Sequence, residues 1–134
     1  MILDANVWIA YVYTDDALHT QAVRLIENST DYPSIIFEYN LLEAVTVLAR
    51  LTGKAKANDF LDLILNTDGI EILPSSPELF EAVVVCYKAH TQRTLSFADY
   101  ALLHLSRTIP VATFDSKLKN AIKRDKGKYY ASAV

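Results

Sequence analysis

Cysteine is almost absent from this sequence, because Cys86 is the only one among 134 residues. A single cysteine excludes an intrachain disulfide and argues against a zinc site built from cysteines. Nowhere does the chain reach the ~20 consecutive apolar residues of a membrane-spanning helix. The opening residues 1–4 include an acid and no basic leader. We therefore expect a cytoplasmic protein without membrane association.

Net positive charge is also lacking, since 16 acidic residues outnumber 13 basic ones and leave a charge of −3. Any nucleic-acid-binding surface must therefore be local. The basic residues are uneven along the chain, and six of the 13 follow residue 116: Lys117, Lys119, Lys123, Arg124, Lys126 and Lys128. This run fits either a solvated basic helix or a surface that contacts a polyanion.

Internal repeats, low-complexity segments and interdomain linkers are missing as well, so residues 1–134 are expected to form one domain. Half of the residues are apolar, which is enough for a sizeable core. Cys86 falls in an apolar run, 82–86, where a small buried side chain is the simpler role.

Short apolar runs of strand length alternate with longer amphipathic runs, which is typical of α/β folds. This order predicts a three-layer α/β/α architecture with a mainly parallel central sheet of four to five strands. Gly53 is expected to end one helix, and Ser76 with Pro77 to begin another. The predicted strands are 2–3, 35–37, 70–73 and 110–114, with an additional edge strand at 128–132. The predicted helices are 5–13, 17–28, 40–51, 56–66, 76–90, 96–107 and 116–123, with a loop at 91–95. In the helix at 56–66, the inward residues are expected to be Phe60, Leu61, Ile64 and Leu65.

Two aspartates stand where a predicted strand meets the next helix. Asp4 follows Ile2 and Leu3, and Asp115 follows the strand at 110–114. Parallel α/β sheets bind ligands at the carboxyl ends of their strands, so these acids are candidates for a shared site. Aspartate is also a favoured helix N-cap, and the sequence leaves both roles open.

Two further acids belong to the same set of candidates. Asp99 lies three residues after Ser96, which fits a helix capping box, but its apolar neighbours would make an unpaired carboxylate costly. Glu43 lies near the end of the second strand, although a helical wheel places it opposite the apolar face, as for a solvated glutamate. Mg²⁺ prefers oxygen ligands of this kind and keeps several waters, one of which can become a nucleophile for phosphoryl transfer.

At this point the sequence resembles the PIN-domain family, and specifically the VapC-type toxins of bacterial and archaeal toxin–antitoxin pairs. Four motifs spread over essentially the whole chain carry the resemblance. They are Ile2-Leu3-Asp4-Ala5-Asn6, Asn40-Leu41-Leu42-Glu43-Ala44-Val45, Leu95-Ser96-Phe97-Ala98-Asp99 and Thr113-Phe114-Asp115. The sequence departs from the family pattern at three places: Ala5 replaces a frequent hydroxyl residue, Tyr100 and His104 are bulky, and Phe114 stands where a basic residue is common.

The resemblance implies a ribonuclease that uses Mg²⁺ or Mn²⁺, with Asp4, Glu43, Asp99 and Asp115 as catalytic metal ligands. It implies supporting roles for Asn6 and Thr113. It also implies an RNA substrate, an antitoxin protein as partner, and a homodimer. In that setting the RNA-binding candidates are Lys117, Lys119, Lys123 and Arg124, because an acidic site needs positive charge nearby to accept a polyanion.

Three alternatives remain open at the level of sequence. The first is a housekeeping RNA-processing nuclease, and the second is a metal-free PIN-like module that only binds RNA or protein. The third is a phosphatase with Asp4 as nucleophile, but Asn6 stands where such enzymes usually carry a second acid. His19, His90 and His104 lack ligand spacing, so we interpret them as surface or satisfied residues.

Overall fold

The chain folds around a four-stranded parallel sheet, seen in a computed structural model that describes residues 1–29, 31–91 and 94–130. The strands are β1 (Ile2–Leu3), β2 (Ser34–Phe37), β3 (Ile70–Leu73) and β4 (Val111–Ala112), in the order β3-β2-β1-β4. Each neighbouring pair is parallel, with Ile2 opposite both Ile35 and Val111. The predicted fold class is confirmed, with four strands.

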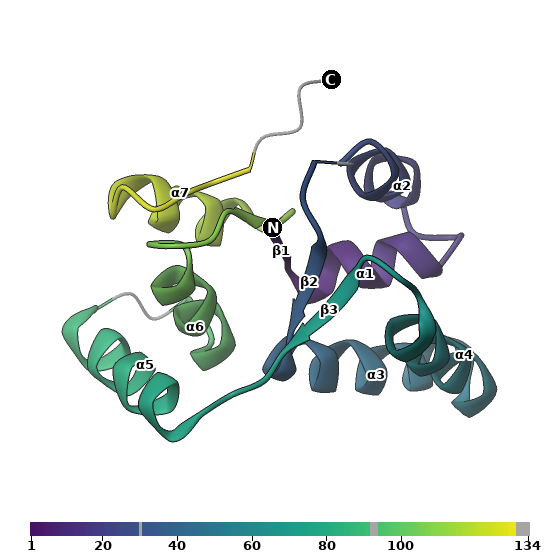
Figure 1. Cartoon of the computed structure of the whole chain (residues 1–134), viewed down its shortest axis with the longest axis horizontal. Helices are drawn as coiled ribbons and strands as arrows, with labels where there is room; N and C mark the ends of the chain where they lie inside the picture. The colour runs from purple at the N-terminus through teal and green to yellow at the C-terminus, as the bar shows by residue number, and fades with distance from the viewer. Residues whose placement is uncertain (30, 92–93, 131–134) are drawn as a thin grey trace.

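Seven helices connect and cover these strands in the described residues. Figure 1 shows one group of helices on one side of the sheet and a second group on the other, which makes three layers. The first group is α1 (Ala5–Val12), α2 (His19–Glu27), α3 (Glu38–Thr52) and α4 (Lys54–Asn66). The second is α5 (Pro77–Ala89), α6 (Phe97–Leu105) and α7 (Ser116–Arg124).

The strands divide the apolar residues between two cores, because successive side chains of a strand point to opposite faces. Ile2, Phe37 and Val111 pack with α5, α6 and α7. Leu3, Ile36 and Ala112 pack on the other face, against the group from α1 to α4. Such burial on both faces explains why β1, β2 and β4 read as short apolar runs, whereas the edge strand β3 is less buried and carries Glu71.

All predicted helix boundaries agree with the structure to within two residues, and the differences have local causes. The third helix begins at Glu38 because β2 runs into α3 without a loop. Gly53 ends that helix with a φ of 94°, and Ser76 caps α5 by accepting from the Leu79 N–H at 3.1 Å. The last strand is shorter than predicted, since β4 covers only Val111–Ala112.

Three other predictions need correction or lie partly outside the described residues. Leu65, expected inward, is 63% exposed, whereas Phe60 and Ile64 of the same helix are buried. The predicted edge strand at 128–132 appears only as a single parallel bridge between Tyr129 and Val111, and its residues 131–132 lie outside the described residues. Residues 92–93 of the predicted loop at 91–95 also lie outside them.

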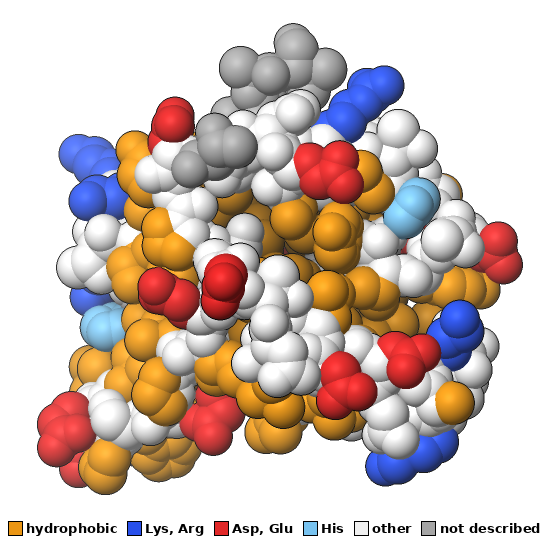
Figure 2. Space-filling model, turned by 45° about the vertical axis from the view of Figure 1, so that its right-hand side comes forward, with side chains coloured by type: hydrophobic (Ala, Val, Ile, Leu, Met, Phe, Trp, Pro, Cys, Tyr) orange, Lys and Arg blue, Asp and Glu red, His pale blue; other side chains and the backbone are white. Residues whose placement is uncertain are grey.

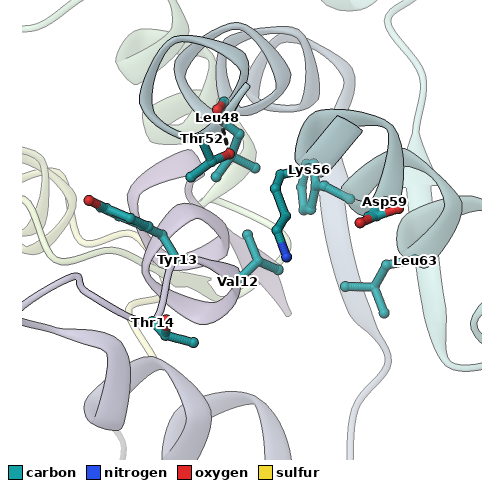
Figure 3. A pocket seen from close by; sticks show the side chains of 9 residues that line it. Val12, Tyr13, Thr14, Leu48, Thr52, Lys56, Asp59 and Leu63 are labelled. Carbon is teal, nitrogen blue, oxygen red and sulfur yellow. Dashed lines mark hydrogen bonds between the residues drawn. The ribbon is translucent and has the colours of Figure 1, made fainter. Parts of the chain in front are cut away.

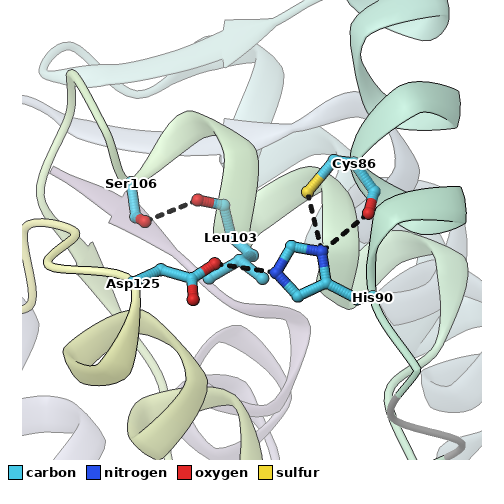
Figure 4. A network of polar contacts seen from close by, with 5 residues as sticks. All are labelled: Cys86, His90, Leu103, Ser106 and Asp125. Carbon is cyan, nitrogen blue, oxygen red and sulfur yellow. Dashed lines mark hydrogen bonds and ion pairs between the residues drawn. The ribbon is translucent and has the colours of Figure 1, made fainter.

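Cys86 is buried, as predicted, and borders a small polar network that joins α5 to the end of α7 (Figure 4). His90 Nδ1 contacts the Cys86 carbonyl oxygen at 2.7 Å, and its Nε2 lies 2.9 Å from Asp125 Oδ2. The Cys86 carbonyl and then the Asp125 carboxylate raise the pKa of His90. The network therefore favours the imidazolium, with both ring nitrogens donating.

This network predicts a pH-dependent part of the stability. A histidine with a raised folded-state pKa contributes stability that is fully present below the unfolded pKa of ~6.5 and is lost as pH rises through the folded value. Because the pair is partly exposed, we expect the contribution to be below about 1 kcal/mol. Urea unfolding from pH 5.5 to 8.5 should show wild type losing more stability than Asp125→Asn. If the free energy of unfolding changed equally with pH in the two proteins, this role of the His90–Asp125 pair would be contradicted.

Candidate functional site

The sequence brings acidic side chains to the point where the strand order reverses. The chain adds β2 and β3 to one side of β1 and then returns to place β4 on the other side. Ligand sites of open α/β sheets lie at the carboxyl ends of the strands at such a reversal. Asp4 directly follows β1, and Asp115 follows shortly after β4, so both candidates lie at this position.

Asp4 is the most buried of the four candidate acids, with 5% exposure. Its Oδ1 accepts from the Ala5 N–H at 2.7 Å and from Asn40 Nδ2 at 3.1 Å, and its Oδ2 accepts from Thr113 Oγ1 at 2.7 Å. Burial raises the pKa of Asp4 to about 6, helped by the charges of Asp99 and Glu43 and opposed by the Thr113 hydroxyl. The side chain is an N-cap, as one alternative predicted, and it also lies within electrostatic reach of two other candidates.

Asp99 forms the capping box that its spacing predicted. Its Oδ2 accepts from the Ser96 N–H at 2.8 Å, while the Asp99 N–H donates to Ser96 Oγ at 3.1 Å. Even with these favourable contacts, burial raises its pKa, and the charge of Asp115 adds to the increase. Asp99 is therefore a cap that is also partly desolvated and lies within electrostatic reach of Asp115.

Glu43 lies on α3 and is exposed as a residue, in agreement with its place on the helical wheel. Partial desolvation of its carboxyl group nevertheless raises its pKa, and the charge of Asp99 raises it further. Asp115 caps α7, because its Oδ1 accepts from the Lys117 N–H at 2.9 Å. The electrostatic coupling therefore joins all four predicted acids through Asp99, which we call the acid cluster: Asp4, Glu43, Asp99 and Asp115.

Thr113 and Asn6 hold this cluster together. Thr113 Oγ1 donates to Asp4 and accepts from Asn6 Nδ2 at 3.2 Å and from the Asp115 N–H at 3.0 Å. Asn6 Oδ1 also accepts from the Phe114 N–H at 3.2 Å. A single hydroxyl thus fixes the first and last acids relative to each other, although they come from opposite ends of the chain. Both residues that the motifs marked as supporting are placed beside the acids.

Asn40 is a member of the site that the sequence reasoning missed. It is 1% exposed and donates to Asp4, and its Oδ1 is a buried acceptor without a partner among the described residues. The available signal was a polar residue in the first turn after β2, three residues before Glu43 and therefore on a neighbouring helix face. A buried amide oxygen without a donor fits a site that receives an additional hydrogen-bond donor, such as a metal-bound water.

The acid cluster is open and is not a preformed cage. Among residues 1–29, 31–91 and 94–130, no three His, Cys, Asp or Glu side chains are already arranged to hold a metal ion. Mg²⁺ is commonly held by one or two carboxylates and several waters, with substrate phosphate completing the shell. Hard oxygen donors, carboxyl groups with raised pKa values and the unpaired Asn40 oxygen together fit such an ion.

The three histidines do not join the acid cluster. His19 Nδ1 contacts the Ala10 carbonyl oxygen at 2.7 Å, and His90 belongs to the network with Asp125. For His104 we expected a surface position or satisfied hydrogen bonds, but its Nδ1 is buried without a partner in the described part of the chain. Burial and the nearby Arg107 charge lower its pKa, so the neutral form is favoured.

Three cavities of the described residues lie outside the acid cluster itself. One of about 430 Å³ lies between α1, α3 and α4, where Leu48, Phe60 and Leu63 form apolar walls and Lys56 crosses the opening (Figure 3). Another of about 540 Å³ is lined by Tyr11, Tyr32 and Ile70. A third of about 320 Å³ adjoins Thr113. None of these three is lined by a carboxylate of the acid cluster.

Charge and apolar surface alternate over the face in Figure 2, where acidic side chains stand among hydrophobic surface and Lys and Arg lie toward the edges. The basic residues of α7 are arranged by its amphipathic pattern. Leu118, Ala121 and Ile122 are buried, which turns Lys117, Lys123 and Arg124 to the exposed side. Lys119 is half-buried, with its Nζ 5.1 Å from the centre of the Tyr129 ring. The basic helix begins directly after Asp115.

No helix in the described residues has the length and apolar character needed to cross a membrane.

Comparison with known proteins gives consistent matches. The family model described as PIN domain matches residues 1–123. Mycobacterium tuberculosis VapC20, a sarcin-ricin loop cleaving toxin, superposes with a TM-score of 0.80 at 22% identity over 90% of this chain and 93% of that one. Rickettsia felis VapBC2, solved with a DNA fragment from its promoter, gives 0.65 at 15% identity over 90% and 91%. Neisseria gonorrhoeae FitAcB gives 0.65 at 16% identity over 97% and 96%. No curated protein sequence matches the chain. At these identities the structural likenesses establish a shared fold.

Proposed function

This chain belongs to the PIN-domain family, and on that premise we propose that it is a metal-dependent endoribonuclease that hydrolyses RNA phosphodiester bonds. The observation that carries the proposal is the acid cluster at the reversal of strand order, with electrostatic coupling through Asp99 and raised pKa values for three of its four acids. Converging carboxyl groups of this kind are unfavourable in the folded protein unless a cation compensates them.

We assign the metal-binding role to Asp4, Glu43, Asp99 and Asp115, with Mg²⁺ or Mn²⁺ as the ion. The ion would supply an activated water and charge stabilisation for in-line displacement at phosphorus. Thr113 and Asn6 orient Asp4 and Asp115, and the buried Asn40 amide fixes the Asp4 oxygen that does not contact Thr113. Through these contacts the three polar residues position the acids.

The biological role that we propose is that of a toxin neutralised by an antitoxin protein. The likeness of fold to VapC20 and to VapBC2 supports this choice over a housekeeping nuclease. We also propose that the chain acts in the cytoplasm and as a homodimer. Co-expression with the product of a neighbouring small gene distinguishes the two roles: a toxin is inhibited and copurifies with it, and a processing enzyme does neither.

The activity itself is tested with single-stranded RNA and DNA oligonucleotides of one sequence, each incubated with Mg²⁺, with Mn²⁺ and with EDTA. We expect internal cleavage of the RNA that requires a divalent ion and is absent in EDTA. Cleavage that persists in EDTA would reject the metal mechanism. Failure to cleave any RNA, together with tight RNA binding, would favour the alternative of a binding module.

The exposed basic residues of α7 lead to a prediction about salt dependence. Replacing Lys117 and Lys123 with Gln should weaken binding of every single-stranded RNA and reduce the slope of log K against log salt by about 0.7 for each phosphate that is no longer neutralised. Binding is measured in EDTA over a series of salt concentrations. The control replaces Lys54 and Lys88, which carry the same charge on α4 and α5. An unchanged slope in the α7 variant, or an equal change in the control, would remove α7 from the RNA-binding surface.

A further inference from the structure

A polar and aromatic cavity lies directly behind the strand end that carries the acid cluster. Its volume is about 320 Å³, and it is enclosed by α2, the end of β4, the first turn of α7 and the segment at Tyr129 and Tyr130. Three of its walls are aromatic rings, from Phe114, Tyr129 and Tyr130. We call this cavity the β4 pocket, and its polar lining includes Gln21, Thr113, Ser116 and Lys119.

The β4 pocket is continuous with the acid cluster through Thr113. Thr113 is one of the residues that line the pocket, and its side chain donates to Asp4 Oδ2 at 2.7 Å. The next residue, Phe114, forms a wall of the pocket, and the residue after it is Asp115 of the cluster. Phe114 is held in place by the bond from its N–H to Asn6 Oδ1 at 3.2 Å. The pocket therefore shares Thr113 with the hydrogen-bond network of the acids, and its lining residues Phe114 and Ser116 flank Asp115 in the chain.

The polar groups of the β4 pocket offer both donors and acceptors. Gln21 contributes an amide and Ser116 a hydroxyl, and both residues are exposed, so neither group is buried by the fold. Tyr130 OH pairs with Ser29 Oγ at 3.3 Å, and it is the donor there, because the one hydrogen of the Ser29 hydroxyl goes to the Leu25 carbonyl oxygen. Amide and hydroxyl groups beside aromatic rings are the combination by which proteins hydrogen-bond the edge of an unpaired base while its face stacks.

A cation stands at the same pocket. Lys119 Nζ lies 5.1 Å from the centre of the Tyr129 ring, and Lys123 Nζ lies 5.5 Å from it. The ring itself is oriented by the Tyr129 hydroxyl, which donates to the Thr113 carbonyl oxygen at 3.4 Å. Lys119 lies one helical turn beyond Asp115 and also lines the pocket, so it supplies a positive charge for the phosphate of a nucleotide bound there.

We propose that the β4 pocket binds the base of the RNA nucleotide adjoining the scissile phosphate, with Phe114 as the stacking surface, Gln21 and Ser116 at the base edge and Lys119 on the phosphate. The proposal rests on the ribonuclease function proposed above and adds a place where sequence preference is set. A pocket of about 320 Å³ is at the small end of ligand sites, which fits a single nucleotide. Phe114, which departs from the family pattern, thereby gains a function.

The test measures binding of AMP, GMP, CMP and UMP to the complete chain in EDTA, so that no cleavage is needed. We expect one or two of the four to bind at least about fivefold more tightly than the others and than inorganic phosphate. Phe114→Leu keeps an apolar side chain and removes the flat ring, and it should weaken the preferred nucleotide by about fivefold to 100-fold. Gln21→Ala should reduce the difference between bases. Phe80→Leu, on an exposed aromatic residue of α5, is the control and should change neither.

Two outcomes would overturn the proposal: equal binding of all four nucleotides and of inorganic phosphate, or full affinity in both pocket variants. An assay of RNA cleavage in Mn²⁺ distinguishes failure of the pocket proposal from failure of the proposed ribonuclease function. Cleavage without selective nucleotide binding would leave the ribonuclease and reject the pocket. Selective binding that Phe114→Leu abolishes, in a protein that cleaves no RNA, would keep the pocket and reject the ribonuclease.

Discussion

Asp4→Asn is expected to lower the rate of RNA cleavage by at least about 100-fold to 1000-fold while the protein stays folded. Metal-ion catalysis supplies several kcal/mol of transition-state stabilisation, and each ~1.36 kcal/mol corresponds to a factor of ten in rate. An amide keeps the acceptor oxygen for the Ala5 N–H, and asparagine is as good an N-cap as aspartate, so α1 is preserved. Cleavage rates in Mn²⁺ and circular dichroism give the two readouts.

Asp16→Asn is the matched control for that substitution. Asp16 Oδ1 accepts from the Leu18 N–H at 2.8 Å near the start of α2, so it is an aspartate with a comparable local role outside the acid cluster. The control should cleave RNA at the wild-type rate. If Asp4→Asn also kept its activity, Asp4 would be a helix cap only and the proposed site would be wrong.

The second large effect is stabilisation by the metal. Mg²⁺ or Mn²⁺ binds the folded cluster and not the unfolded chain, so the free energy of unfolding should increase by about 2.7 kcal/mol at ~100 times the dissociation constant. For a chain of this length we expect a rise in Tm of about 10 °C. Thermal melts at increasing Mn²⁺, compared with melts in EDTA, measure the gain.

The raised pKa values of the acids determine the pH range in which the metal increases the stability strongly. With a pKa of about 6 in the folded protein, against an ordinary value of 3.8, Asp4 binds more protons when folded than when unfolded across that window. The stability of the metal-free protein should therefore fall by up to about 3 kcal/mol as pH rises from ~4 to ~6, before any opposing groups are counted. Because the metal needs the ionised carboxylates, its effect should grow over the same window. A metal-induced gain that stays constant across this window would contradict the coupling.

Asp115→Asn separates the role of Asp115 as the cap of α7 from its role as a negative charge in the acid cluster. The amide can still accept from the Lys117 N–H, so the cap of α7 is kept, while one negative charge leaves the cluster. We expect this variant to be at least as stable as wild type in EDTA and to gain less from Mn²⁺. A variant that is clearly less stable in EDTA and responds fully to Mn²⁺ would show that Asp115 only caps the helix.

The sequence predicted the architecture because each element carried a local signal. Ile2 and Leu3 before Asp4, or Ser76 before Pro77, mark boundaries that depend on few residues, and the structure places them as expected. Leu65 was predicted wrongly, since helical periodicity cannot tell which edge of an apolar stripe faces the sheet. That decision depends on how α4 packs in three dimensions.

Part of the candidate site was also predictable from signals in the sequence, namely the ends of the predicted strands. Strand ends placed Asp4 and Asp115 together, because parallel strands of one sheet end on the same side. Asn40 was missed, since nothing local distinguishes a buried amide in the first turn of α3 from an exposed one. The role of the Thr113 hydroxyl as a link between Asp4 and Asp115 also needs the sheet order, which brings β4 next to β1.

Asp99→Asn gives the most direct test of the central claim, because the structure assigns Asp99 two roles that this substitution separates. The amide oxygen can still accept from the Ser96 N–H, so the capping box and the start of α6 remain, while the charge that couples the four acids is removed. RNA cleavage by wild type and by Asp99→Asn is measured in Mn²⁺ and in EDTA, with the melting temperature of each protein. We predict a folded variant without metal-dependent cleavage; a variant that cleaves RNA in Mn²⁺ at the wild-type rate would contradict the claim that the acid cluster holds the catalytic metal.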